Sequence, residues 1–361
     1  MVSSRFVQVL AALAVLAAFL LWADTSFNDY RLQLIILVAI NCVVAVSLTM
    51  SSGYTGVFSL GQVGFMAIGA YVGAIVNLPL IWKDEILLPG LPSWLATLNT
   101  TGWPDFLALL VACLAGGALA AVFGLLVGFP LMRLSGNYVA VATLGFLIIV
   151  YTVLIRWDDV TLGARGLNPV PGYTTVWSAY GWALAAVYIA WRIKRSSFGR
   201  SMIASRDNLI AAKAIGVRVH RARLLAFTLT AFLSGAAGAL FAHQIGTISP
   251  NSFYFTTTFN IIIMVVLGGL GSISGAVVGA VIVTLAPEYL RGLEDGLELG
   301  PIRYDEAFGL SQIVLAVTFI VVMAVRPAGL FGDREVDPAS WLRGRRSRPE
   351  RTSVAPPSVL E

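Results

Sequence analysis

Long stretches without a charged residue alternate with short charged segments along the 361-residue chain. A helix needs about 20 mainly apolar residues to cross the hydrocarbon core of a membrane, so these stretches count the spans. Two of them, 32–82 and 224–287, have room for two and three spans, and those that fit one span are 6–23, 106–132, 134–155, 166–191 and 307–325. The pattern predicts an all-α polytopic membrane protein with about ten transmembrane helices, some short or broken.

The basic residues set the orientation of the predicted spans. Residues 192–223 hold nine Lys and Arg residues against one acid, Asp207, and seven more Arg residues follow from Arg326 onward. Lys and Arg accumulate on the cytoplasmic side of membrane proteins, so both segments and both termini are predicted to be cytoplasmic. An even number of spans must then separate the two segments. The run 224–287 and the span 307–325 meet this condition only if the run crosses three times, which places a helix break at GGLGS, residues 268–272.

Composition excludes several other classes of protein. Hydrophobic residues make up 58% of the chain and charged residues only 12%, whereas soluble domains carry about 25% charged residues. The net charge of +5 lies in two segments, so we do not expect nucleic-acid binding. No motif for a metal, a cofactor or a catalytic residue occurs, and the three lysines follow Trp, Ile and Ala, which excludes a phosphate-binding G-K-[ST] loop.

The predicted spans carry no Asp, Glu, Lys or Arg at their centres. Ion-coupled carriers often need such a group, so a self-sufficient carrier is the weaker reading. His243 is the titratable group within 224–287, and we expect it to be a hydrogen-bonded structural residue. Cys42 and Cys113 lie in apolar runs and are expected to be buried free thiols. Small-residue pairs are expected to pack helices closely: Gly69/Gly73, Gly124/Gly128 and Gly275/Gly279.

A polar but uncharged segment, SSGYTGVFSLGQ at 51–62, interrupts the run 32–82. Irregular backbone at membrane depth is tolerated only inside protein or beside a watery cavity. We therefore predict a break between two helices at Ser51–Gly56, inside the bundle and beside a translocation path. A flexible tight turn is the alternative. The candidate path residues are Ser51, Ser52, Gly53, Tyr54, Thr55, Gly56, Ser59 and Gln62.

The basic segment SSFGRSMIASRDNLIAAKAIGVRVHRAR, residues 196–223, has the features of a short docking helix. Gly199 allows a sharp turn after the sixth span, Asp207 is the predicted N-cap of a helix over 208–215, and Gly216 suits its left-handed end. A helix of this length is unstable alone and needs a surface to dock on. The segment either docks on another protein or lies on anionic lipid as a basic loop.

Several stretches resemble one family. A-A-x-x-x-G at Ala211, Ala212 and Gly216 resembles the E-A-A-x-x-x-G coupling helix of bacterial ABC importer permeases, with Ile210 in place of the Glu. Residues 32–332 resemble the branched-chain amino acid permeases of LivM type. The stretches that carry the resemblance are SGYTGVFSLGQVGFMAIGAY, LSGNYVAVATLGF, FGRSMIASRDNLIAAKAIGV, SPNSFYFTTTFNIIIMVVLGGLGSISGAVVGA and RPAGLFG.

The resemblance implies a permease domain over 1–332 in a bacterial inner membrane, and it implies that the chain is not itself an enzyme. The expected partners are a second homologous permease, two cytoplasmic ABC ATPase subunits and an extracytoplasmic substrate-binding protein, all at the lipid bilayer. Within the coupling segment 196–222 it assigns ATPase coupling to Phe198, Gly199, Arg200, Arg206, Asp207, Asn208, Ala211, Ala212 and Gly216.

The expected substrate is a branched-chain or other hydrophobic amino acid. Urea, short amides and aromatic acids remain alternatives within the family, and a secondary carrier or channel and a membrane scaffold are alternatives outside it. Residues 333–361 fall outside the resemblance, and their Arg- and Pro-rich composition predicts a disordered tail.

Overall fold

The structure is a computed structural model that describes residues 2–81, 83, 100, 102–134, 136–294, 298–299, 302–303, 310–326, 328–332 and 335. Apart from Glu335, the predicted tail 333–361 lies outside these residues, as do parts of the predicted outer loops 77–105 and 288–306. The chain divides into two units, and the larger, Trp22–Glu335, holds every contact described below.

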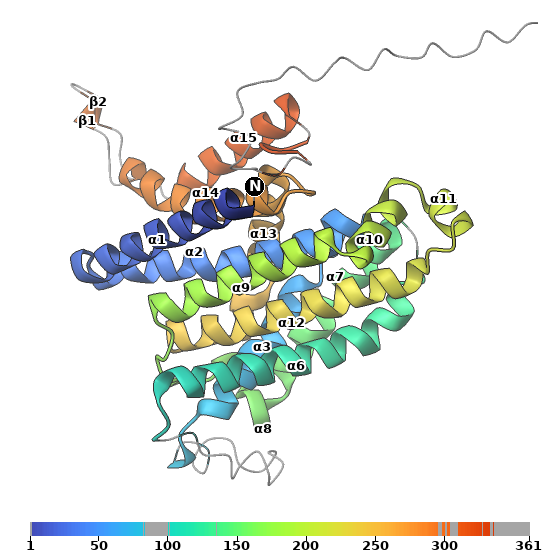
Figure 1. The fold of residues 1–361 in the computed structure, drawn as a ribbon. Coiled ribbons are helices and arrows are strands. Elements are labelled where there is room, and N and C mark those ends of the chain that lie inside the picture. Colours follow the sequence, from blue (N-terminus) through green and yellow to red (C-terminus); the bar gives the residue numbers. More distant parts are fainter. Residues whose placement is uncertain are drawn as a thin grey trace, which may run out of the picture. The chain divides into compact units, whose positions relative to one another are not determined.

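Each predicted span overlaps a helix among the described residues (Figure 1). These helices are α1 (Val2–Ser26), α2 (Asp29–Leu48), α3 (Gln62–Asn77), α6 (Asp105–Leu131), α7 (Asn137–Arg156), α9 (Val176–Arg195), α12 (Val219–Ile245), α13 (Phe255–Gly268), α14 (Ile273–Glu294) and α15 (Leu310–Val325). The shorter elements are η1 (Thr49–Gly53), α8 (Asp158–Thr161), η2 (Gly163–Arg165), α10 (Ser197–Asp207), α11 (Leu209–Ala214), η3 (Pro250–Phe253) and the antiparallel pair β1 (Glu298–Leu299) and β2 (Ile302–Arg303).

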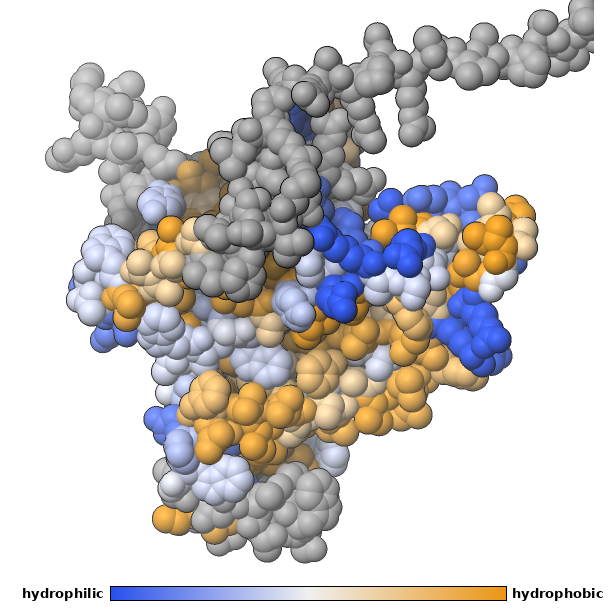
Figure 2. Space-filling model, in the orientation of Figure 1, coloured by the Kyte–Doolittle hydropathy of each residue, from blue (hydrophilic) through white to orange (hydrophobic). Residues whose placement is uncertain are grey.

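Six helical stretches in the described part of the chain are long and apolar enough to cross a membrane. They are Asp29–Gly53, Asp105–Leu131, Tyr138–Arg156, Val219–Ile245, Pro250–Gly268 and Ile273–Leu290. Three further apolar helices are shorter: Ala11–Ser26, Gln62–Asn77 and Ala316–Val325. Along α6, large apolar side chains are exposed from Phe106 to Phe129, and Figure 2 shows hydrophobic residues covering this helix, as expected for a lipid-facing surface.

The sixth predicted span, 166–191, is displaced in the structure. Its helix, α9, begins only at Val176, where Thr175 and Ser178 form a capping box. The preceding residues are not helical because Gly166 has a positive φ of 74° and two prolines, Pro169 and Pro171, follow it. The polar last turn of α9 holds Arg192, Lys194 and Arg195.

The core of the larger unit forms around α12, which packs against α6, α3 and α2. Small residues bring these backbones together: a Cβ on Gly69 of α3 would overlap the Gly235 carbonyl of α12. A Cβ on Gly124 of α6 would lie 2.6 Å from the Ala231 Cβ of α12. The pairs Gly69/Gly73 and Gly124/Gly128 thus lie at contacts with α12, which agrees with their predicted packing role.

The third glycine pair lies between α13 and α14. A Cβ on Gly275 would overlap the Gly268 carbonyl, and one on Gly279 would overlap the Met264 carbonyl. The chain turns between these two helices at residues 269–272, where Gly269 has a φ of +116°. The helix break predicted at GGLGS is therefore confirmed.

Gly238→Ala tests the close packing of α12 on α3. A Cβ on Gly238 would overlap the Met66 carbonyl oxygen, a backbone atom that cannot move aside without shifting a helix. Overpacking of this kind costs about 1–3 kcal/mol, so we expect a lower melting temperature for the detergent-solubilised protein. Gly145→Ala in α7 is the control, because no atom lies within 4 Å of its added Cβ. Equal melting temperatures for the two variants would contradict the packing.

Candidate functional site

The polar segment 51–62 continues the second helix before it breaks. A π-helical turn, η1, follows α2, and Gly56 N–H still donates to Ser52 O at 3.1 Å. The chain leaves the helix at Gly56, whose φ is +69°, and α3 begins at Gln62. The predicted break at Ser51–Gly56 is thus wrong in its bounds, because the wider π-turn lets the helix run on; the break spans residues 56–61.

Neutral hydroxyl groups accept hydrogen bonds from three backbone N–H groups of this break. Val57 N–H donates to Thr55 Oγ1 at 3.3 Å, and Ser59 N–H donates to Ser52 Oγ at 3.3 Å. Leu60 N–H donates to Thr143 Oγ1 of α7 at 2.9 Å. Buried backbone N–H groups need such partners where no water is present. This explains why the segment is polar and uncharged.

Gln62 joins three helices at the start of α3. Its Nε2 donates to Ser47 Oγ of α2 at 2.7 Å and also bonds to Ser234 Oγ of α12. The two serine hydroxyls are 3.0 Å apart, and Thr230 Oγ1 of α12 donates to Ser47 O at 3.0 Å. These side chains are buried, so the polar cluster fixes the position of α3 against α2 and α12.

Three candidate path residues keep a buried polar atom without a hydrogen-bond partner in the described part of the chain. They are the Tyr54 hydroxyl, the Ser59 hydroxyl and Gln62 Oε1, on side chains that are at most 2% exposed. Ser51, Ser52, Gly53 and Thr55 are also buried, whereas Gly56 is exposed. Buried polar groups are normally bonded, so each exception requires an explanation. Three exceptions within nine residues mark this segment as a candidate binding surface.

The first part of the coupling segment is α10, which turns back directly after α9. Ser196 caps α10 by accepting from Gly199 N–H at 3.2 Å. A Cβ on Gly199 would overlap the Ile193 carbonyl, so this tight turn requires glycine. Phe198 and Arg200 are exposed, and Arg200 Nη1 donates to Arg195 O at 3.0 Å.

The second part is α11, whose N-cap differs from the prediction. Asp207 was predicted as the cap but is the last residue of α10. Asn208 has the extended backbone that a cap requires, and its Oδ1 accepts from Ile210 and Ala211 N–H, both at 3.0 Å. Because α10 runs through Asp207, the N-cap of α11 lies one residue later than predicted, at Asn208.

The C-terminal end of α11 agrees with the prediction. Gly216 has a φ of +83°, and its N–H donates to Lys213 O at 3.0 Å. Val217 N–H donates to Ala212 O at 3.0 Å, which completes a Schellman motif. Ala212 is 2% exposed and faces the protein, whereas Ile210 and Ile215 are 82% and 76% exposed. The tip of α11 therefore presents apolar side chains outward.

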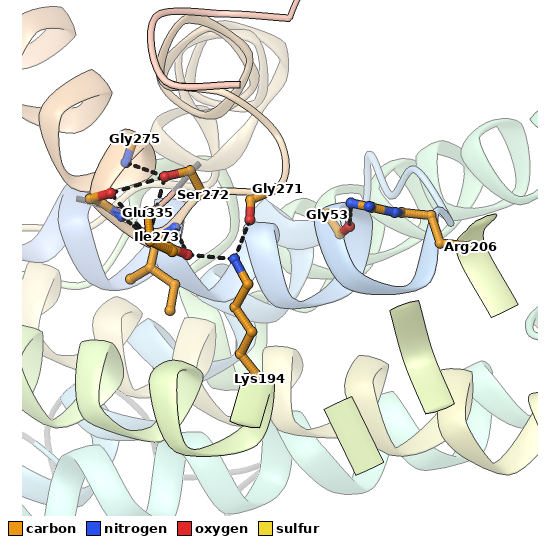
Figure 3. A network of polar contacts seen from close by, with 9 residues as sticks. Gly53, Lys194, Arg206, Gly271, Ser272, Ile273, Gly275 and Glu335 are labelled. Carbon is orange, nitrogen blue, oxygen red and sulfur yellow. Dashed lines mark hydrogen bonds and ion pairs between the residues drawn. The ribbon is translucent and has the colours of Figure 1, made fainter. Parts of the chain in front are cut away.

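The coupling segment is bonded directly to the segment that contains the break. Arg206 Nη1, at the end of α10, donates to Gly53 O at 2.9 Å (Figure 3). A Cβ on Gly56 would lie 2.8 Å from Arg206 Cγ, and one on Gly53 would overlap the Leu270 carbonyl in the α13–α14 turn. α10 therefore contacts η1 without an intervening element.

A second set of contacts, the Glu335 cluster, lies near the hydrogen bond between Arg206 and Gly53 (Figure 3). Glu335 Oε1 pairs with Lys194 Nζ at 2.6 Å and accepts from Ile273 N–H at 2.9 Å. Its Oε2 accepts from Ser274 N–H at 3.1 Å, and Lys194 Nζ also donates to Gly271 O at 2.7 Å. The carboxylate thus caps α14 and connects the chain after α15 to the end of α9.

Sequence analysis did not identify the Glu335 cluster. Glu335 lies in the stretch 333–361 that was predicted to be a disordered tail, and Lys194 was counted only as a cytoplasmic base. A signal was present, because SIS at 272–274 follows a glycine turn and offers the free N–H groups of a helix start. Its acidic partner lies about 60 residues away and cannot be found by local spacing.

Burial alone would raise the pKa of Glu335. The hydrogen bonds from Lys194, Ile273 and Ser274 and the charge of Lys194 outweigh burial, so the pKa of this carboxyl lies below its usual value of 4.5. Glu335 is therefore charged at neutral pH.

His243 has both ring nitrogens in hydrogen bonds. Nδ1 lies 2.8 Å from Ala239 O, Nε2 lies 2.9 Å from Asn77 Nδ2, and the ring stacks on Tyr173. These contacts fit the expected structural role. Cys42 and Cys113 are free and buried, as predicted.

Comparison with known proteins settles the family. The family described as the permease component of branched-chain amino acid transport systems matches residues 30–323, which include both 51–62 and the coupling segment. The chain belongs to this family. It is therefore a transport component of the ABC importer class, and the six described helices that are long and apolar enough to cross a membrane agree with a multi-pass membrane permease. No solved structure is significantly similar.

Individual relatives agree with the family. The high-affinity branched-chain amino acid transport system permease protein LivM of Escherichia coli is 28% identical over 329 residues, covering 81% of this chain and 68% of LivM. LivM of Salmonella typhimurium is 28% identical, covering 80% and 67%. The autoinducer 2 import system permease protein LsrC of Klebsiella pneumoniae is 36% identical over 184 residues, covering 46% of this chain and 51% of LsrC.

Glu335→Gln tests the pH dependence of the Glu335 cluster. A carboxyl whose folded-state pKa is lowered stabilises the fold above its unfolded-state pKa and loses this contribution as pH falls through the folded-state pKa. Between pH 7 and pH 5 we expect the free energy of unfolding of the variant to be lower than that of wild type by on the order of 1 kcal/mol. Below pH 4.5 the difference should shrink. Melting temperatures across this range measure it, with Asp207→Asn as the control. A difference that grows in acid would contradict the assignment.

Proposed function

We propose that this chain is a membrane-spanning permease subunit of an ATP-driven importer for branched-chain or other hydrophobic amino acids. The family match over residues 30–323 and the relatedness to LivM over 81% of the chain support this substrate class. The match to LsrC covers only 46% of the chain and supports the importer class more than a substrate.

The proposal includes the partners that such an importer requires. A second, similar permease completes the pathway, two cytoplasmic ATPase subunits supply the energy, and an external binding protein delivers the substrate. The chain itself hydrolyses nothing. The setting is a bacterial inner membrane.

The hydrogen bond from Arg206 to Gly53 is the observation that carries the mechanism. Arg206 lies in the last turn of α10, and α11 follows, with Ile210 exposed on it and Ile215 exposed at its C-cap. ATP binding closes the ATPase dimer under α11 and displaces α10. Because Arg206 holds Gly53, the displacement reaches η1 and the break after it, and the path between the permeases changes its open side.

Substrate contact is proposed at Tyr54, Ser59 and Gln62, whose buried polar atoms lack partners in the described structure. The hydroxyl groups of Ser52, Thr55 and Thr143 already accept hydrogen bonds from backbone N–H groups of the break, so they are less suited to bind substrate. Hydroxyl and amide groups without formal charge can bond both ends of a zwitterion, and the N-terminal end of α3 favours its carboxylate.

Ten spans with both termini in the cytoplasm form the proposed topology, since each predicted span overlaps a helix. A phosphatase reporter fused after residue 300 is expected to be active, because the proposed topology puts this position on the non-cytoplasmic side of the membrane. A β-galactosidase reporter at the same place should be inactive. The opposite pair of activities would contradict the topology.

The double variant Ile210→Asp, Ile215→Asp tests docking of the ATPase. Both side chains are mostly exposed, so the fold should persist while two desolvated apolar contacts to the partner are replaced by charges. We expect ATP-dependent leucine uptake by proteoliposomes that hold all subunits to fall at least about tenfold, together with ATPase co-purification.

Val325→Asp, 75% exposed at the end of α15, is the matched control and should keep both activities. Normal uptake by the double variant would contradict the docking site. Leucine flux through the purified chain alone, without ATP, would identify a self-sufficient carrier instead.

A further inference from the structure

A cavity of about 320 Å³ opens between α10 and the start of α12. The side chains of Ser197, Phe198, Ser201, Val217, Arg218 and Arg221 line it, and none of its lining residues is acidic or belongs to α11. The apolar tip of α11 and this basic cavity are therefore two different surfaces of the coupling segment.

The two arginines give the cavity its charge. Arg218 and Arg221 are three residues apart at the start of α12, so their side chains share one side of the chain. Both are exposed, and neither has an ion pair with a described residue. Asp207, the acid of this segment, is paired with Arg206 instead, with Nε and Oδ1 3.1 Å apart.

The N-terminal end of α10 adds hydrogen-bond donors. Ser197 is the first residue of this eleven-residue helix, and Ser201 lies one turn further on the same face. The Ser201 hydroxyl donates to Ser197 O at 3.0 Å, and Gly199 N–H donates to Ser196 Oγ. The start of α10 therefore offers a ligand the Ser197 hydroxyl and the N–H groups of Ser197 and Phe198. Two guanidinium groups opposite a positive helix end form a site for a phosphate group.

Aromatic residues indicate the depth of the cavity in the membrane. On α9, just before α10, Arg195 lies over the exposed Trp191 ring at 4.3 Å. Just after α6, Arg133 lies over the exposed Phe129 ring of that helix at 4.6 Å, and this ring packs edge-on against His220, the neighbour of Arg221. Exposed aromatic and basic side chains together are typical of the lipid headgroup level. Figure 2 shows hydrophilic residues around α10 and α11.

We propose that this cavity binds the phosphate group of an anionic phospholipid from the inner leaflet. The phosphate lies between Arg218 and Arg221 and the start of α10, and the apolar Phe198 and Val217 contact the lipid beside its headgroup. The lipid joins α10 to α12, so it holds the base of the coupling segment while the tip of α11 stays open to a protein partner. The proposal does not depend on which solute is imported.

Native mass spectrometry of the full-length chain in detergent tests the proposal, with phosphatidylglycerol and phosphatidylcholine of equal acyl chains as probes. Wild type should retain phosphatidylglycerol in preference, and Arg218→Gln with Arg221→Gln should lower this retention about tenfold. Phosphatidylcholine retention should not change. Arg133→Gln with Arg192→Gln is the matched control, because it removes the same charge from the same side of the membrane outside the cavity.

A further variant tests the site even if the arginine double variant does not fold. Ser201→Glu keeps both arginines, adds a carboxylate to the cavity and should also expel phosphatidylglycerol. Equal loss of the lipid in the test and control pairs would overturn the site in favour of general surface attraction. Displacement by an equal concentration of inorganic phosphate would overturn the lipid as the source of the phosphate. Loss of ATPase co-purification with unchanged lipid retention would assign the arginines to the protein partner and overturn the proposal.

Discussion

The backbone leaves its helix at the exposed Gly56 and passes through the protein to Gly61, and the N–H groups that it buries there need partners within the protein. Hydroxyls from Thr55, Ser52 and Thr143 meet this constraint, and they do so without charge. The break therefore needs α7 beside it to supply Thr143. It also fixes where α3 begins, and with it the position of Gln62 against α2 and α12. The core of small residues around α12 allows the approach that these hydrogen bonds require.

The same break explains how the segment 196–222 connects to the interior of the larger unit. A regular helix end would offer its last carbonyls to water, but the carbonyl of Gly53 accepts from Arg206 of α10. The α13–α14 turn lies against Gly53, and the Glu335 cluster fixes that turn through Lys194. Four parts of the chain that are far apart in the sequence thus meet at one place: η1, the α9–α10 region, the α13–α14 turn and Glu335. A movement of the coupling segment acts on this place first, which gives the proposed transport cycle a physical route.

Sequence analysis predicted the helical class, the positions of the long helices and the GGLGS turn, because charge-free runs and glycines are local signals. It placed the cap of α11 one residue early, since both Asp207 and Asn208 can cap a helix and only the length of α10 decides between them. It began the sixth span ten residues early, because a run without charges does not reveal the non-helical backbone at Pro169 and Pro171. The Arg206–Gly53 bond and the Glu335 cluster join residues that are 153 and 141 positions apart, and such pairs carry no local pattern.

The measurement that tests the central claim most directly is the labelling rate of Ser59→Cys in the complete transporter, with Cys42 and Cys113 replaced by alanine. A thiol reagent that enters the pathway should modify this buried position faster during ATP turnover, and leucine should slow the reaction. Adding Arg206→Ala should remove the ATP dependence, because α10 no longer holds Gly53, whereas Arg192→Ala at the exposed end of α9 should keep it. A labelling rate that is the same with and without ATP and leucine would contradict the account.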